Sequence, residues 1–86
     1  MIRSKILVIN KLGLHARAAT KLASTAGRYS SSIRTGTQEP LVDAKSIMSL
    51  MLLAAAQGTE LIFEFDGPEQ ELACQAITDL FADYFG

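Results

Sequence analysis

Two parts of the chain alternate apolar and polar residues, as half-buried β-strands do. Residues 2–9 are rich in β-branched side chains, and residues 61–66 place Leu or Phe at every second position. Residues 29–35 and 41–43 have strand-forming or extended character and are separated by turn-forming residues at 36–40, which is typical of a hairpin. The pattern therefore predicts four strands, of which the middle two form a hairpin.

Two other segments repeat their apolar residues at helical spacing. The first covers residues 16–26 and is followed by Gly27, a residue type common at the C-terminal cap of a helix. The second covers residues 46–57, with Ser46 as the expected N-cap and Gly58 as the expected terminator. The sequence thus predicts one helix after the first strand and one after the hairpin.

A third helix is predicted after the last strand. Residues 66–69 combine cap candidates, Pro68 at the first helical position and acid in the first turn, which together signal a helix start. One apolar stripe then continues to the end of the chain and is expected to face the core: Ala73, Ala76, Ile77, Leu80, Phe81 and Tyr84.

The predicted order of elements is β-α-β-β-α-β-α. It favours an α+β fold with two layers, a four-stranded antiparallel or mixed sheet carrying helices on one face. A chain of 86 residues with 49% hydrophobic content has the size of one domain, residues 1–86, with a small core. RNA-recognition modules, acylphosphatases and other two-layer domains share the first six elements, so the order does not identify a function.

Several classes of protein are excluded by what the sequence lacks. Cys74 is the only cysteine, and no Cys/His cluster is present, so we expect no disulfide, no metal site and no cofactor. The longest apolar run, residues 50–56, is far shorter than the ~20 residues of a membrane span. The N-terminus lacks the apolar region and cleavage site of a signal peptide. We therefore expect a soluble cytoplasmic domain that does not enter a membrane.

Charge is distributed unevenly along the chain although the net charge is only −1. Residues 1–45 hold all eight basic residues and two acidic ones, a net charge of +6, whereas residues 46–86 hold seven acidic residues and no basic one, a net charge of −7. A basic surface of this kind suits an acidic protein partner or a nucleic acid. Two differently charged solvated faces without a partner would give the same count.

His15 is the only histidine, and it stands where the first helix is predicted to begin. The first N–H groups of a helix have no intrahelical partner and form the positive end of its dipole, so they attract anions, and a neutral imidazole placed there is a nucleophile. A phosphoryl group on His15 would be held by the N–H groups of the first turn, including that of Ala16, and by the Arg17 guanidinium. On position alone, a helix cap or an ordinary surface histidine is the alternative.

The residues around His15 identify a family resemblance. Gly13-Leu14-His15-Ala16-Arg17, followed by Ala18-Ala19, resembles the active-site signature of the histidine-containing phosphocarrier (HPr) family. Asp43-Ala44-Lys45-Ser46-Ile47-Met48 resembles the second signature of that family, and Gln57-Gly58-Thr59 resembles its turn into the last strand. The resemblance covers the whole chain and implies an open-faced β-sandwich, in which four antiparallel strands lie under three helices.

The resemblance also implies a function and its residues. His15 would accept a phosphoryl group on Nδ1 from phosphorylated enzyme I, which draws it from phosphoenolpyruvate, and would pass it to an EIIA-type protein. Arg17 would be the charge partner of the phosphate. Ser46 would be the regulatory serine that HPr kinase phosphorylates where that enzyme exists.

One departure from the family pattern bears on the branch of the phosphotransferase system. The family commonly has Pro where this chain has Ala18, a change that costs rigidity but adds a backbone donor in the first turn. Ala18 and the preceding residues 10–13 look most like the nitrogen-related branch (NPr), whose relay ends at a regulatory EIIA. Lys45 and Ser46 look as much like the branch that serves carbohydrate EIIA proteins.

Two surfaces near His15 are candidates for docking. The first is a basic ridge along the first helix, formed by Arg17, Lys21, Ser24 and Arg28, with Thr20 next to it. The second is an apolar stripe on the second helix, formed by Ile47, Met48, Met51 and Leu52; it is exposed if Leu50, Leu53 and Ala54 face the core. A solvated basic face, a stripe packed under a loop, and a non-catalytic binding module that uses the stripe remain alternatives.

Other classes of function lack their motifs. No GxSxG, P-loop, HExxH or second histidine is present, which argues against an enzyme. RNA-recognition sheets stack bases on strand aromatics, and the first strand and hairpin offer none beyond Tyr29. An acyl carrier modified at Ser46 does not fit the strand pattern. We therefore expect a phosphocarrier that is not itself an enzyme, with protein partners and no nucleic acid.

Overall fold

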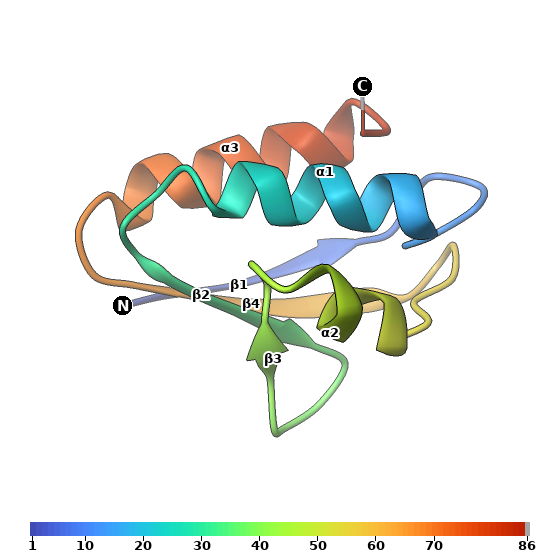
Figure 1. The fold of residues 1–86 in the computed structure, drawn as a ribbon, viewed down its shortest axis with the longest axis horizontal. Helices are drawn as coiled ribbons and strands as arrows, with labels where there is room; N and C mark the ends of the chain where they lie inside the picture. Colours follow the sequence, from blue (N-terminus) through green and yellow to red (C-terminus); the bar gives the residue numbers. More distant parts are fainter. Residues whose placement is uncertain (86) are drawn as a thin grey trace.

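The computed structural model describes residues 1–85. Its elements follow the predicted order, which the structure thereby confirms (Figure 1). They are β1 (Ile2–Leu7), α1 (Ala16–Ala26), β2 (Ser32–Gly36), β3 (Val42–Asp43), α2 (Ile47–Leu52), β4 (Glu60–Asp66) and α3 (Gln70–Ala82).

The four strands form one antiparallel sheet in the order β1-β4-β2-β3. The most apolar strand, β4, occupies an inner position, where Phe63 pairs with Ser4 of β1 on one side and Thr35 of β2 on the other. Every second residue of β4 is buried because successive side chains point to opposite faces of the sheet. The predicted hairpin is confirmed as the short β2–β3 pair.

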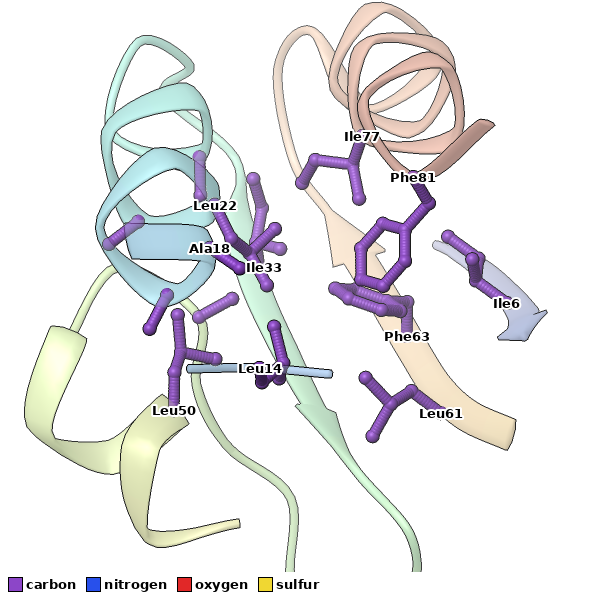
Figure 2. Packing of buried hydrophobic residues seen from close by; sticks show 14 of the residues in the cluster. Ile6, Leu14, Ala18, Leu22, Ile33, Leu50, Leu61, Phe63, Ile77 and Phe81 are labelled. Carbon is purple, nitrogen blue, oxygen red and sulfur yellow. The ribbon is translucent and has the colours of Figure 1, made fainter. Parts of the chain in front are cut away.

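All three helices pack on one face of the sheet and enclose a single core (Figures 1 and 2). α1 is the middle helix, since it contacts both α2 and α3. The ring of Phe63 stacks on that of Phe65, with centroids 5.8 Å apart, and meets the ring of Phe81 of α3 edge-on, with centroids 5.7 Å apart. The core thus joins β4 to α3 by aromatic contacts, and α1 contributes mainly alanines and Leu22 to it.

The predicted second helix is too long. α2 ends at Leu52, and Leu53 is its C-cap. Ala54 has a left-handed backbone with φ of 50°, which stops the helix five residues before the predicted end. The following residues bond to the chain after β1 instead, so Gly58 lies in the turn into β4 and does not terminate the helix.

The ends of α3 also differ from the prediction. Glu69, with φ of 66°, is the N-cap, so the helix begins two residues after Pro68. At the other end Tyr84, which was predicted to face the core, is 63% exposed, and Phe85 is buried. Both residues have left-handed backbones beyond the last helical residue, so helical spacing no longer applies. Phe85 turns inward and packs on Phe81 with ring centroids 4.7 Å apart.

No helix within residues 1–85 combines the length and the apolar character that a membrane span requires.

Candidate functional site

His15 is the N-cap of α1. Its backbone is extended, with φ of −71° and ψ of 176°, and its carbonyl accepts the first helical hydrogen bond, from Ala19 N at 2.8 Å. The imidazole makes no capping hydrogen bond, and the residue is only partly buried. The ring is therefore free of the structural role that a polar N-cap side chain usually has.

The first turn of α1 presents backbone N–H groups as hydrogen-bond donors. The N–H groups of Ala16, Arg17 and Ala18 lie in the first turn of α1, where no helical carbonyl four residues earlier can accept from them. No acidic side chain lies in the first turn. An anion next to His15 would therefore meet free donors and the positive end of the dipole of an eleven-residue helix.

α1 is held firmly against the sheet, which fixes the position of its first turn. One face of the helix is buried: Ala18, Ala19, Leu22, Ala23, Thr25 and Ala26. Leu14, just before the N-cap, is only 4% exposed and belongs to the same cluster (Figure 2). His15 thus lies between two buried parts of the chain, the side chain of Leu14 before it and the inner face of α1 after it, and both restrict the position of its backbone.

The loop before His15 is attached to the segment between α2 and β4. Val8 N donates to Thr59 O and Gly58 N donates to Val8 O, each at 2.8 Å, and the Gln57 side-chain amide donates to Ile9 O at 3.0 Å. Sequence reasoning missed this connection, because the helix was predicted to continue through residue 57. The turn residues Gln57 and Gly58 were the available signal that the chain leaves the helix before β4.

Arg3 is the one basic side chain that forms an ion pair within residues 1–85. Arg3 pairs with Glu39 and Glu64, so part of the charge asymmetry is resolved within the sheet, where basic β1 lies beside acidic β4. Within residues 1–85, Lys11, Arg17, Lys21 and Arg28 form no ion pair. The loop before His15 and the helix after it therefore present positive charge that the fold leaves uncompensated.

The basic ridge of α1 borders a shallow groove of about 380 Å³ between α1 and α3. Its lining residues are mostly polar or basic: Thr20, Lys21, Ser24, Thr25, Arg28 and Leu80. Arg17 is exposed at the start of the same helix. Arg17 and Lys21 thus place positive charge on the first half of α1, and Arg28 adds a cation two residues beyond the end of the helix.

Ser46 is the N-cap of α2, as predicted, and its Oγ accepts from Ser49 N at 3.3 Å. The turn before it is also hydrogen-bonded: Ser46 N donates to Asp43 O at 3.1 Å, and Lys45 N donates to the Asp43 carboxylate at 2.9 Å. Ser46 is partly exposed. It therefore combines a structural hydrogen bond with partial exposure of the residue to solvent.

The apolar residues of α2 divide as expected, with one exception. Leu50 is buried and Leu53 is half-buried, whereas the apolar stripe is exposed: Ile47 at 40%, Met48 at 70%, Met51 at 42% and Leu52 at 82%. The expectation that Ala54 faces the core is wrong, because it lies after the helix end and is exposed. Since α1 and α2 are in contact, the stripe lies on the helix next to the basic ridge.

Residues 1–85 contain no group of three or more His, Cys, Asp or Glu side chains placed to hold a metal ion. The groups at the start of α1 are the His15 imidazole, the backbone N–H groups of the first turn and the Arg17 side chain.

The chain is similar to known proteins over its whole length. The family model described as "PTS HPr component phosphorylation site" matches residues 2–83. "Phosphocarrier protein HPr" of Neisseria meningitidis is 46% identical over 86 residues, covering 100% of this chain and 97% of the relative. The protein of that name from Cupriavidus necator is 44% identical with the same coverage. The crystal structure of HPr-C-His from Thermoanaerobacter tengcongensis matches with a TM-score of 0.95 at 38% identity, covering 100% of this chain and 97% of that one.

Proposed function

This chain belongs to the HPr family, the phosphocarriers of the phosphotransferase system, and from that premise we propose that His15 is the residue that carries the phosphoryl group. The observation that carries the proposal is an imidazole at the N-terminus of α1 that makes no capping hydrogen bond. In the transfer, the Nδ1 lone pair attacks phosphorus while the bond from phosphorus to enzyme I breaks, and Nε2 keeps its hydrogen. The second transfer repeats this step with an EIIA-type protein as acceptor.

The first turn of α1 supports the phosphorylated state. The phosphoryl oxygens are acceptors that suit the N–H groups of Ala16 and its neighbours, and the charge on them is stabilised by the helix dipole. Arg17 is exposed and makes no ion pair within residues 1–85. Its guanidinium is therefore available as the charge partner of the phosphate.

The docking surface consists of the basic ridge, with Thr20, and the apolar stripe. The ridge attracts acidic partners at long range. The stripe supplies apolar contact, and its two methionines can adapt to enzyme I and to EIIA in turn. The adjacency of α1 and α2 supports the view that one partner covers both surfaces.

Ser46 is proposed as a regulatory phosphorylation site for an HPr kinase where the cell has one. Its partial exposure supports access to Oγ, and its position supports the effect, since it immediately precedes Ile47 and Met48 of the apolar stripe. A phosphate there would place negative charge next to apolar contacts and beside the surface that acidic partners approach.

For the branch, we propose the regulatory nitrogen-related system (NPr), on the basis of Ala18 and residues 10–13. The sugar branch is favoured by Lys45-Ser46 and is the second candidate. The two branches are distinguished by measuring the rate of phosphoryl transfer from the phosphorylated chain to a regulatory EIIA and to a carbohydrate EIIA. Faster transfer to the regulatory protein supports the nitrogen branch, and faster transfer to the carbohydrate protein assigns the chain to the other.

The proposal is tested by incubating the purified chain with enzyme I and phosphoenolpyruvate and measuring its intact mass. We expect one added phosphate. It should be lost at acid pH, because acid hydrolyses the N–P bond of phosphohistidine. A chain that binds enzyme I but gains no phosphate would be a non-catalytic binding module using the apolar stripe. An acid-stable phosphate would also contradict His15 as the carrier.

A further inference from the structure

Asn10 is one of the few polar residues of the core, with 8% of its surface exposed. The side-chain Nδ2 of Asn10 donates to the backbone carbonyl of Gly13 at 2.8 Å, and the backbone carbonyl of Asn10 accepts from Gly13 N at 3.2 Å. Within residues 1–85 no protein donor reaches Oδ1 of the same amide. The Gly13 carbonyl is thus the protein partner to which this buried side chain is directed.

The peptide between Gly13 and Leu14 is held at both ends. Its carbonyl accepts from Asn10, and its N–H, that of Leu14, donates to Ala55 O at 2.8 Å. A peptide unit is planar, so hydrogen bonds at its two ends fix the orientation of the whole plane. This plane lies one residue before His15.

The acceptor at Ala55 is itself fixed in place. Gly13 has φ of +64°, and a Cβ on it would lie 2.3 Å from Ala55 O, so the two backbones meet more closely than any other residue type permits. The chain around Ala55 is tied to the end of β1 by the reciprocal hydrogen bonds of Val8 with Gly58 and Thr59. The hydrogen bonds with Asn10 and Ala55 therefore form a clamp that holds the Gly13–Leu14 peptide in one orientation.

We propose that Asn10 is a positioning residue for the phosphoryl-carrying histidine. By fixing the Gly13–Leu14 peptide, it sets the direction in which the chain enters α1, and with it the direction of the His15 ring relative to the first-turn N–H groups. Asn10 does not itself touch the phosphate. This inference rests on the proposed role of His15, and it adds that the imidazole is held in place from outside its own helix.

The test compares Asn10→Ser with Asn10→Leu in rapid-quench transfer from phosphorylated enzyme I. Ser can still donate one hydrogen bond, whereas Leu fills more of the volume but donates none. Because the docking residues are untouched, we expect the carrier concentration at half-maximal rate to stay within about twofold of wild type. The rate constant at saturation should fall about tenfold or more in Asn10→Leu and less in Asn10→Ser. A packing role alone predicts the opposite order.

Thr35→Val is the matched control. Thr35 is fully buried, and its Oγ1 donates to Ile62 O at 2.8 Å within the sheet. This variant also removes one buried side-chain-to-carbonyl hydrogen bond, so it reports the effect of lost stability alone. We expect its saturating rate constant to stay within about twofold of wild type.

Hydrogen exchange of the wild-type protein tests the clamp even if Asn10→Leu does not fold. The Leu14 amide should exchange as slowly as amides of the sheet, and fast exchange there would overturn the proposal. Equal saturating rates for wild type and both Asn10 variants would overturn it as well, and so would a loss equal to that of Thr35→Val. Failure of the proposed function is seen separately, as phosphate uptake by His15→Ala.

Discussion

The N-termini of α1 and α2 are built in different ways. His15 caps α1 with its backbone only, while Ser46 caps α2 with its side chain, which accepts from Ser49 N. α1 has eleven residues and a fully buried face, whereas α2 has six residues and only Leu50 is buried. The N-terminus of α1 keeps an imidazole and the first-turn N–H groups free, and that of α2 uses the Ser46 hydroxyl to start a short helix.

This difference indicates how a phosphate would act at each end. At α1 the phosphate has a long helix dipole, free N–H groups and Arg17 to receive it, so the site can hold a transferable group. At α2 the dipole is short and the exposed apolar stripe lies next to the phosphate. We therefore expect phosphate at Ser46 to act on docking and phosphate at His15 to act in transfer.

The largest effect is expected from His15→Ala, which removes the imidazole proposed to carry the phosphoryl group. Phosphate uptake from enzyme I should fall to zero. The free energy of unfolding should change by less than about 0.5 kcal/mol, because the ring caps nothing. Intact mass and a denaturant titration measure the two quantities, and an unfolded variant would mean that the imidazole is structural.

Arg17→Glu should slow transfer on the order of a hundredfold, since it removes the proposed charge partner of the phosphate and adds a like charge. Stability should be unchanged because the side chain is exposed and forms no ion pair with any of residues 1–85. Arg28→Glu makes the same charge change at the far end of the basic ridge and should cost only a few-fold. Equal losses for the two variants would show that Arg17 contributes only to the general positive charge.

Ser46→Asp places a negative charge at the second end and should slow transfer from enzyme I about tenfold at low salt, with a smaller effect at high salt. Stability should be unchanged or higher, because Asp is a good N-cap. Thr37→Asp, in the exposed turn after β2, is the control for added charge alone. If Ser46→Asp transfers at the wild-type rate at low salt, Ser46 is a helix cap and nothing more.

The smallest effect sharpens the comparison of the two caps. Ser46→Ala should lose up to about 1 kcal/mol of stability, the usual value of a side-chain N-cap, and should transfer normally. His15→Ala should lose none of it. Equal losses of stability in the two variants, measured by denaturant unfolding, would contradict the different construction of the two ends.

Features set by local periodicity were predictable from the sequence. The alternation in β4, the apolar face of α1 and the Ser46 cap each depend on neighbouring residues, and all three were confirmed. The position of His15 at a helix start followed in the same way.

Features set by contacts distant in sequence were not predictable. The end of α2 is determined by a left-handed Ala54 and by bonds from residues 55–59 to the loop after β1, and no Gly or Pro at residue 54 announces it. The burial of Phe85, where Tyr84 was predicted to face the core, depends on the contact with Phe81. The hydrogen bond from Asn10 to Gly13 is short in sequence, but its importance appears only once Ala55 is placed opposite.

The most direct test of the account is the change in backbone amide signals when the chain is phosphorylated by enzyme I. In ¹H–¹⁵N spectra of the free and phosphorylated protein, the amide protons of Ala16, Arg17 and Ala18 should move downfield as they bind the phosphoryl oxygens. The amides of residues 47–49, at the start of α2, should stay in place. Unmoved signals at residues 16–18 in a fully phosphorylated protein would contradict the account.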